Sequence, residues 1–323
     1  MHKGVQSAGR HPHARFRRRR RVSRGTVTLG LLTLFFLAFT VVLLNDLADG
    51  SWSRFEGGWA NLRRLITESL WPPDWAVLEA RNYPPCEAAF GFLCSKAYLG
   101  MLETLKMAFV GTVIGFLGAI VLAPMAASNL SPAWMGVPSR LILAGMRSLP
   151  SIIWAILFVA VVGLGPLAGV LAMAFYTVGY LGKLQFESFE GLGSGPLEAA
   201  RAMGMGRAEV FLFVVVPESA NGLISQLLFM FEYNVRHGSV LGLVGAGGIG
   251  YYLQYYLGFL LYDSVMALIM VIFVVVVCID AASRRIRSFL SESDDVPKAS
   301  WLSVFMTPEH AASADARTSE STN

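Results

Sequence analysis

The apolar runs of this chain constrain its fold most, because several are long enough to cross a lipid bilayer. A membrane-spanning helix needs about 20 consecutive apolar residues, and the segment 26–45 contains no charged residue. The composition agrees, since 54% of the 323 residues are hydrophobic and only 15% are charged. That balance excludes an ordinary soluble domain and predicts an all-α integral membrane protein.

The apolar runs and the polar segments between them divide the chain into a series of parts. These are a basic tail (1–25), a first transmembrane helix (26–45), an external segment (46–97), a transmembrane core (98–287) and a polar tail (288–323). Six transmembrane helices are predicted, at 26–45, 98–127, 140–163, 167–182, 212–233 and 259–279. A cleaved signal peptide is the competing interpretation of the first run, but its apolar region would be only about 7–15 residues long.

Basic residues flank the first and last apolar runs. Eight arginines lie between Arg10 and Arg24, and Arg284, Arg285 and Arg287 follow the last run. Such flanks stay on the cytoplasmic side, so we expect both termini in the cytoplasm and the protein in a bacterial inner membrane. Arginine runs also bind nucleic acid, but beside an apolar span we favour a topology signal, with membrane lipid and no nucleic acid as the partner.

Two of the three cysteines, Cys86 and Cys94, lie eight positions apart in the segment predicted to be external. A disulfide can form outside the cytoplasm, but sequence alone does not give its geometry. The bonded and the free state therefore both stay open. Cys278 lies in the last apolar run, where we expect an ordinary membrane-embedded residue, and no metal site is expected.

The stretch from Glu198 to Pro217 reads EAARAMGMGRAEVFLFVVVP and differs from its apolar surroundings, because it mixes charge, glycine and alanine. Ser194 and Pro196 precede it in the pattern of a helix N-terminus, a small capping residue followed by proline. Gly204 should end a short helix, and a second should begin near Gly206. The sequence predicts a helix–turn–helix on the cytoplasmic side, pressed against another protein. An amphipathic linker is the alternative.

This stretch resembles the EAA motif of permease subunits of ATP-binding-cassette (ABC) importers, in which E-A-A, three residues and Gly precede a hydrophobic stretch ending in Pro. In that family the motif forms a coupling helix that docks in a groove of the ATPase subunit. Small alanines permit close approach there, and the glycine permits the sharp turn. The resemblance implies ATPase coupling for Glu198, Ala199, Ala200, Gly204, Met205 and Gly206.

The stretch 229–250 reads FMFEYNVRHGSVLGLVGAGGIG and is similar to the phosphonate permeases among the ABC importers. This resemblance implies a type I ABC-importer permease core with one extra N-terminal span. It also implies a second permease chain, identical or homologous, together with ABC ATPase subunits inside and an extracytoplasmic phosphonate-binding protein. Such a chain is a transport subunit rather than an enzyme and binds no cofactor, because ATP and Mg²⁺ belong to the partner ATPase.

The resemblance implies phosphonate or a related small phosphorus oxyanion as cargo, with another small solute as the alternative. An ion-coupled secondary transporter would carry mid-bilayer carboxylates and internal repeats, and neither is clear in this sequence. An intramembrane enzyme would need a catalytic pair inside the spans, and none is visible. The sequence contains no G-x-x-x-x-G-K-[ST] pattern, so the ATPase is expected to be another chain.

Polar residues at the end of the fifth predicted span are candidates for the translocation path. Charged residues at membrane depth face a pathway or pair with one another, and the arginine fork can donate two hydrogen bonds to phosphonate oxygens. A salt bridge between Glu232 and Arg236 is the structural alternative, and for Arg147 it is an anchor at the cytoplasmic end. The predicted path residues are Glu232, Asn234, Arg236, His237 and Arg147.

Glycines dominate the end of the same stretch, in a segment predicted to be external or re-entrant. Gly245, Gly247 and Gly250 fit G-x-G-x-x-G, but a dinucleotide site needs a preceding strand and a following helix, whereas membrane spans flank this segment. We instead expect close packing and a helix break that lines a cavity. The predicted gate and packing residues are Gly245, Gly247, Gly248 and Gly250.

Overall fold

The structure, a computed structural model, describes residues 24–48, 52–80 and 90–290. The chain divides into two compact units, one ending at Leu65 and one beginning at Ile66. The first unit contains α1 (Arg24–Leu47) and α2 (Ser53–Arg64). Helix α1 corresponds to the predicted first span, and the Thr33 and Thr40 hydroxyls bond to carbonyls one turn earlier. These bonds give the two hydroxyl groups the hydrogen-bond partners that lipid cannot provide.

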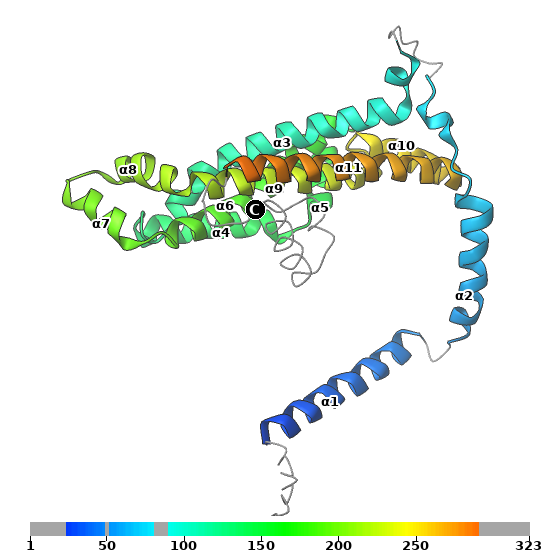
Figure 1. The fold of residues 1–323 in the computed structure, drawn as a ribbon, viewed down its shortest axis with the longest axis horizontal. Helices are drawn as coiled ribbons and strands as arrows, with labels where there is room; N and C mark the ends of the chain where they lie inside the picture. Colours follow the sequence, from blue (N-terminus) through cyan, green and yellow to red (C-terminus); the bar gives the residue numbers. More distant parts are fainter. Residues whose placement is uncertain (1–23, 49–51, 81–89, 291–323) are drawn as a thin grey trace, which may run out of the picture. The chain divides into compact units, whose positions relative to one another are not determined.

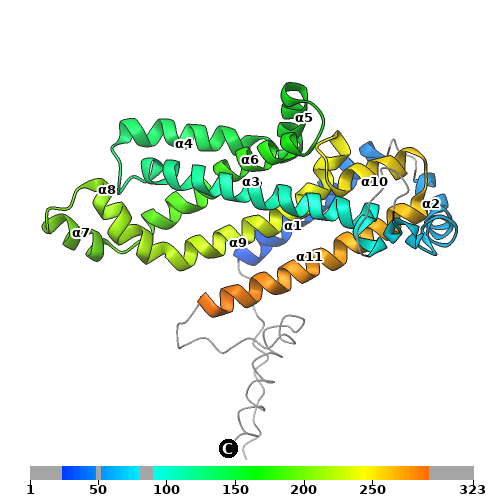
Figure 2. The same cartoon turned by 90° about the horizontal axis from the view of Figure 1, so that it is seen from above.

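The second unit is a helical bundle, and the described residues form no strand, only an isolated bridge between Ala80 and Ser95. Figures 1 and 2 show α3, α6 and α9 lying side by side, with α7 and α8 at one end and α10 at the other. The α-helices of this unit are α3 (Lys96–Ala126), α4 (Ala133–Ser148), α5 (Ser151–Val162), α6 (Pro166–Glu190), α7 (Ser194–Ala202), α8 (Arg207–Val210), α9 (Val216–Leu241), α10 (Ile249–Gly258) and α11 (Tyr262–Leu290).

The described residues contain five helices long and apolar enough to cross a membrane, or up to six spans if the bent pair of α4 and α5 forms one. This confirms the predicted all-α membrane fold. Short turns complete the second unit: a π-turn at Leu65–Leu70 that begins at the boundary, another at Phe211–Val215, and 3₁₀ turns at Trp75–Leu78, Gly91–Cys94 and Gly242–Val244.

Helices α3 and α6 pack closely because small residues line their contact. A Cβ atom built on Gly115 would lie 2.4 Å from the Cβ of Thr177, and one on Gly111 would lie 2.8 Å from the Cβ of Met173. Small residues let membrane helices approach until their backbones nearly touch, which increases the van der Waals contact that holds them together in lipid. The α3–α6 pair therefore forms the packed centre of the second unit.

The predicted continuous span 140–163 is wrong, because α4 and α5 meet at an angle of 89°. The break lies at Leu149 and Pro150, which have extended ψ angles of 141° and 148°. Proline disfavours the helical conformation of the residue before it and donates no backbone hydrogen bond. The Trp154 indole donates to the Met146 carbonyl at 3.0 Å and so satisfies an oxygen at the interrupted end of α4.

Other helix ends also differ from the prediction. Helix α6 continues past Gly182 to Glu190. Helix α9 begins at Val216, directly after the π-helical segment Phe211–Val215. Pro217 therefore lies inside a helical segment that runs from Arg207 to Val244, where π-helical geometry changes to α-helical geometry. Helix α9 then continues to Leu241, so the glycine-rich segment begins with helix before the chain turns into α10.

Candidate functional site

The segment that joins α6 to α9 is a compact helix–turn–helix, here called the elbow (residues 194–210). It consists of α7, a turn at Gly204 and α8, and it lies at one end of the second unit (Figure 1). Gly204 has φ +82°, a left-handed conformation that glycine adopts without the steric cost of a Cβ atom. Its N–H donates to the Arg201 carbonyl at 3.0 Å, and the Met205 N–H donates to the Ala200 carbonyl at 3.2 Å.

The two sides of α7 have different surroundings. Leu197 and Ala200 are buried against a cluster that contains Phe189 and Leu223. Glu198 and Ala199 are exposed, as are Gly204, Gly206 and the Met203 side chain, which is 74% exposed; Met205 is half-buried. Of the residues predicted to couple to an ATPase, Ala200 therefore packs inward, while the others, apart from half-buried Met205, remain accessible.

The helix caps of the elbow differ from the sequence prediction. Gly193, and not Ser194, occupies the N-cap of α7, and no side chain bonds to that cap. At α8 the Gly206 N–H donates to Glu209 Oε2 at 2.6 Å. Glycine has no side chain to complete a reciprocal capping box, so Glu209 alone stabilises the start of this short helix.

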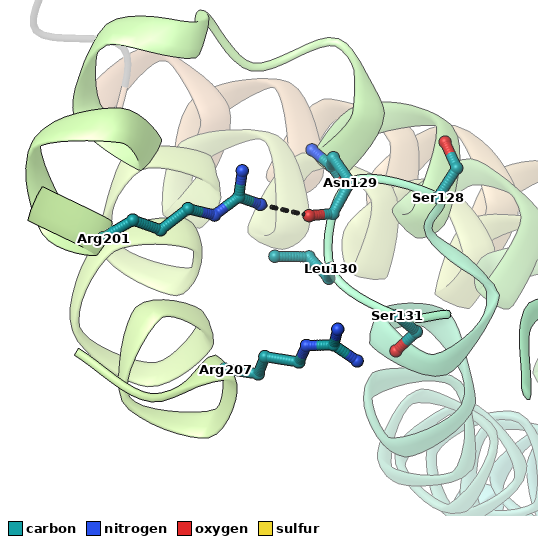
Figure 3. Close-up of a pocket in the computed structure, with 6 residues that line it drawn as sticks. All are labelled: Ser128, Asn129, Leu130, Ser131, Arg201 and Arg207. Carbon is teal, nitrogen blue, oxygen red and sulfur yellow. Dashed lines mark hydrogen bonds between the residues drawn. The ribbon is translucent and has the colours of Figure 1, made fainter. Parts of the chain in front are cut away.

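Two arginines of the elbow reach toward the loop between α3 and α4. Figure 3 shows Arg201 and Arg207 on either side of Leu130, and Arg201 Nη2 donates to the Asn129 carbonyl at 2.5 Å. The pocket between them has a volume of about 350 Å³, and Ser128 and Ser131 also line it. Sequence reasoning missed this contact, because 72 positions separate its two residues.

Glu190, at the end of α6, joins the same loop to α4. Its Oε1 atom accepts hydrogen bonds from the N–H of Ser128 at 2.6 Å and from the Ser128 hydroxyl at 2.7 Å. Arg140 Nη2 donates to the same oxygen at 2.5 Å, and Arg140 Nε donates to the Ala126 carbonyl at 2.7 Å. A second contact joins α6 to the loop, since Asn129 Nδ2 donates to the Phe189 carbonyl at 2.8 Å. The ends of α3 and α6 are thereby bonded to the middle of α4 and, through Asn129, to the elbow.

The predicted pair on α9 belongs to a larger charge cluster with α11. The Glu232 carboxylate accepts a hydrogen bond from Arg287 at 2.8 Å, whereas Arg236 lies 4.0 Å away. Arg236 in turn lies 3.5 Å from Asp280. Only 8% of the Glu232 side chain is exposed, and sequence reasoning missed both partners on α11. The translocation-path roles of Glu232 and Arg236 stay predictions.

Asn234 is 1% exposed and connects three helices. Its Nδ2 atom donates to the hydroxyl of Thr112 on α3 at 2.9 Å and to that of Thr177 on α6 at 3.0 Å. The neighbouring His237 ring stacks on Tyr233 with ring centroids 3.7 Å apart. The structure thus places Asn234 inside the helix contact and His237 half-buried beside it, and their predicted path roles are untested.

The predicted glycine segment makes a tight break between α9 and α10. Gly245, Gly247 and Gly248 have φ angles of +84°, +81° and +73°. The Gly165 N–H donates to the Gly245 carbonyl at 2.9 Å, so the start of α6 packs on this break. A Cβ atom on Gly250 would lie 2.1 Å from the Ser239 carbonyl oxygen. The glycines permit close packing here, and gating stays a prediction.

Two of the three cysteines, Cys94 and Cys278, lie in the described residues. Cys94 is buried at the end of the Gly91–Cys94 turn, but Cys86 lies outside the described residues, so the disulfide stays a prediction. Cys278 is exposed on α11. Among the described residues, no group of three or more His, Cys, Asp or Glu side chains is placed to hold a metal ion.

Comparison with known proteins relates this arrangement to transport permeases. Residues 96–291 match the family described as "Binding-protein-dependent transport system inner membrane component". The phosphite transport system permease protein PtxC of Stutzerimonas stutzeri is 39% identical over 189 residues, which cover 58% of this chain and 68% of that protein. The phosphate-import permease protein PhnE of Mycolicibacterium smegmatis is 37% identical over 214 residues, which cover 65% of this chain and 39% of that protein.

A solved structure shares the fold. An inward-facing conformation of the MetNI methionine ABC transporter has a TM-score of 0.56 and 23% identity, and the match covers 61% of this chain and 97% of that chain. Together these matches confirm the resemblance to ABC-importer permeases drawn from residues 198–217 and 229–250. The chain is a multi-pass membrane protein, and it belongs to the family of inner membrane components of binding-protein-dependent transport systems.

Proposed function

We propose that this chain is the permease subunit of an ABC importer for phosphonate or a related small phosphorus oxyanion. The cargo assignment is supported by relatives whose names specify phosphite and phosphate transport. The chain provides the membrane path and performs no covalent chemistry. ATP and Mg²⁺ bind to a partner ATPase, because this sequence contains no phosphate-binding G-x-x-x-x-G-K-[ST] loop of its own.

The observation that carries this proposal is the exposed outer face of the elbow. Glu198, Ala199 and Met203 lie on the side of α7 that faces away from the bundle, and Met203 is 74% exposed. The small residues Ala199 and Gly204 beside Met203 leave room for the close approach of a partner protein, as the resemblance to the EAA motif implies. We assign this face to the ATPase subunit, which would transmit its closure to the permease through the elbow.

The remaining parts of the assembly follow from the same proposal. A second permease chain, identical or homologous, completes the path, and an extracytoplasmic binding protein delivers the oxyanion. Both termini lie in the cytoplasm, as the arginines before the first span and after the last span predict. This orientation puts the elbow in the cytoplasm, on the side of the ATPase.

The test is a pair of substitutions at Gly204, in the complex reconstituted with its ATPase and binding protein in liposomes. Gly204→Trp adds a bulky side chain to the exposed turn and forces a left-handed conformation on a residue that resists it, at a cost of about 1–2 kcal/mol. Gly204→Asn is the matched control, because asparagine tolerates that conformation and no atom lies within 4 Å of the added Cβ.

We expect Gly204→Trp to abolish the ATP hydrolysis stimulated by the loaded binding protein and the uptake of labelled methylphosphonate, while Gly204→Asn retains both. Basal ATP hydrolysis by the ATPase subunits should persist in both variants. Normal coupling in the Gly204→Trp complex would refute the assignment of the elbow to the ATPase.

A further inference from the structure

A groove with excess positive charge lies between α4 and α6. Its volume is about 360 Å³, and its charged lining residues are Arg140, Arg147, Lys183 and Glu187. We propose that this groove is an anion-binding site of the translocation path, in which Arg147 and Lys183 bind the phosphorus oxyanion. The inference rests on the proposed function and adds to it a defined binding site for the cargo.

The floor of the groove is one face of α6. Lys183 and Glu187, which both line the groove, are four residues apart, so they lie along one stripe of the helix. Helix α4 packs directly beside that stripe, because a Cβ atom built on Gly182 would lie 2.4 Å from Leu143 Cδ2. Lys183 is therefore held at the border between the two helices, next to the side chains of α4.

The charges that line the groove are unequally compensated. Arg140 donates hydrogen bonds to Glu190 and to the Ala126 carbonyl, so the Glu190 carboxylate already compensates its positive charge. Among the described residues, Lys183 pairs only with Glu187, at 3.4 Å, and the two side chains are 38% and 49% exposed. Exposed pairs of this kind are weak. Arg147 has no ion pair or hydrogen bond through its side chain within the part of the chain that the structure describes. The groove thus carries unneutralised positive charge.

Arg147 also lies far from the loop end of the bundle. A Cβ atom on Gly179 would lie 2.9 Å from the Arg147 backbone nitrogen. Gly179 precedes Glu190 by eleven residues, or about 16 Å along the helix axis. A charged side chain in a membrane helix is costly and usually pairs with another group or faces a substrate or ion pathway, and Arg147 has no such pair among the described residues.

The chemistry of the two cations fits a small tetrahedral oxyanion. The planar guanidinium can donate two parallel hydrogen bonds to two oxygens of one phosphorus group, and the ammonium adds a third donor and a second positive charge. The end of the α4 dipole alone would favour a cation at position 147, but it does not explain why Lys183 lines the same groove. The break at Pro150 ends α4 just after Arg147, which therefore lies in the last turn of that helix and lines the groove.

The test is equilibrium binding to the full-length chain in lipid nanodiscs, measured by calorimetry with inorganic phosphate, phosphite, methylphosphonate and sulfate. Arg147→Gln and Lys183→Gln should each raise the Kd for the phosphorus oxyanions about tenfold or more, because each removes a hydrogen bond to a charged group. Lys183→Arg should keep the Kd within about threefold of the wild-type value by retaining the charge. Arg284→Gln is the matched control, since it removes an exposed arginine of α11 outside the groove, and it should leave binding unchanged.

Each outcome decides either this inference or the proposed function. Wild-type affinity in both glutamine variants, or no binding of any anion by the wild-type chain, overturns the groove as an anion site, while the elbow experiment still decides the proposed function. Binding of sulfate alone, lost in both glutamine variants, supports the groove and overturns the phosphorus oxyanion as cargo. Native thermal stability of each variant excludes misfolding as the cause of a lost signal.

Discussion

The charge cluster between α9 and α11 makes a sharp prediction for Glu232→Gln. This substitution keeps the shape of the side chain and removes the only negative charge within 4.0 Å of Arg287 among the described residues. Removing one partner of a buried ion pair costs about 3–5 kcal/mol. The Arg287 and Arg236 side chains are 30% and 44% exposed and can be partly hydrated. We therefore expect a smaller loss, about 2 kcal/mol.

That loss should be visible in thermal unfolding of the full-length chain in detergent. A change of about 2 kcal/mol corresponds to a decrease in Tm of about 3 °C for a chain of this size. Arg287→Gln should produce a similar decrease, and the double variant should lose less than the sum of the two, because residues in contact are not independent. An unchanged Tm for Glu232→Gln, or strict additivity in the double variant, would contradict the cluster as a stabilising contact.

Further substitutions test helix packing and the predicted path. Gly115→Leu should lower the free energy of unfolding by about 1–3 kcal/mol, because its Cβ would lie 2.4 Å from Thr177. Gly145→Leu serves as the control, because its Cβ would meet no atom within 4 Å. Measurements of Tm compare the two variants. Asn234→Leu removes both interhelical bonds of a buried amide and should cost about 1–2 kcal/mol by the same measurement. Arg236→Gln should reduce methylphosphonate uptake by the reconstituted complex if the residue lies on the path, and unchanged uptake at normal expression would remove it from the path.

The length and composition of the apolar runs predicted most of the fold. Helices α1, α3 and α11 cover the runs that contain few charges. The third span was mispredicted, because its apolar composition continues through Pro150 although the backbone does not. The dipeptide Leu149–Pro150 was the available signal, since the residue before proline avoids the helical conformation.

The sequence predicted only those features of the candidate site that depend on residues close together in the chain. The turn at Gly204 follows from glycine's tolerance of positive φ, and the sequence prediction placed it correctly. The bond from Arg201 to Asn129 spans 72 positions, and the closest partner of Glu232 is 55 positions away. Local spacing instead favoured Arg236, because it is four residues from Glu232 in the sequence. In the structure Arg236 lies farther from the Glu232 carboxylate than Arg287 does. Contacts of this kind depend on how the helices pack.

The hydrogen bonds around Glu190 have a mechanical consequence. They unite Ser128, Arg140 and the end of α6, and Asn129 extends the connection to Arg201 of α7. A force applied to the elbow is therefore distributed over α3, α4 and α6 instead of passing along one of these helices. Loss of a single bond should weaken the transmission of force without severing it.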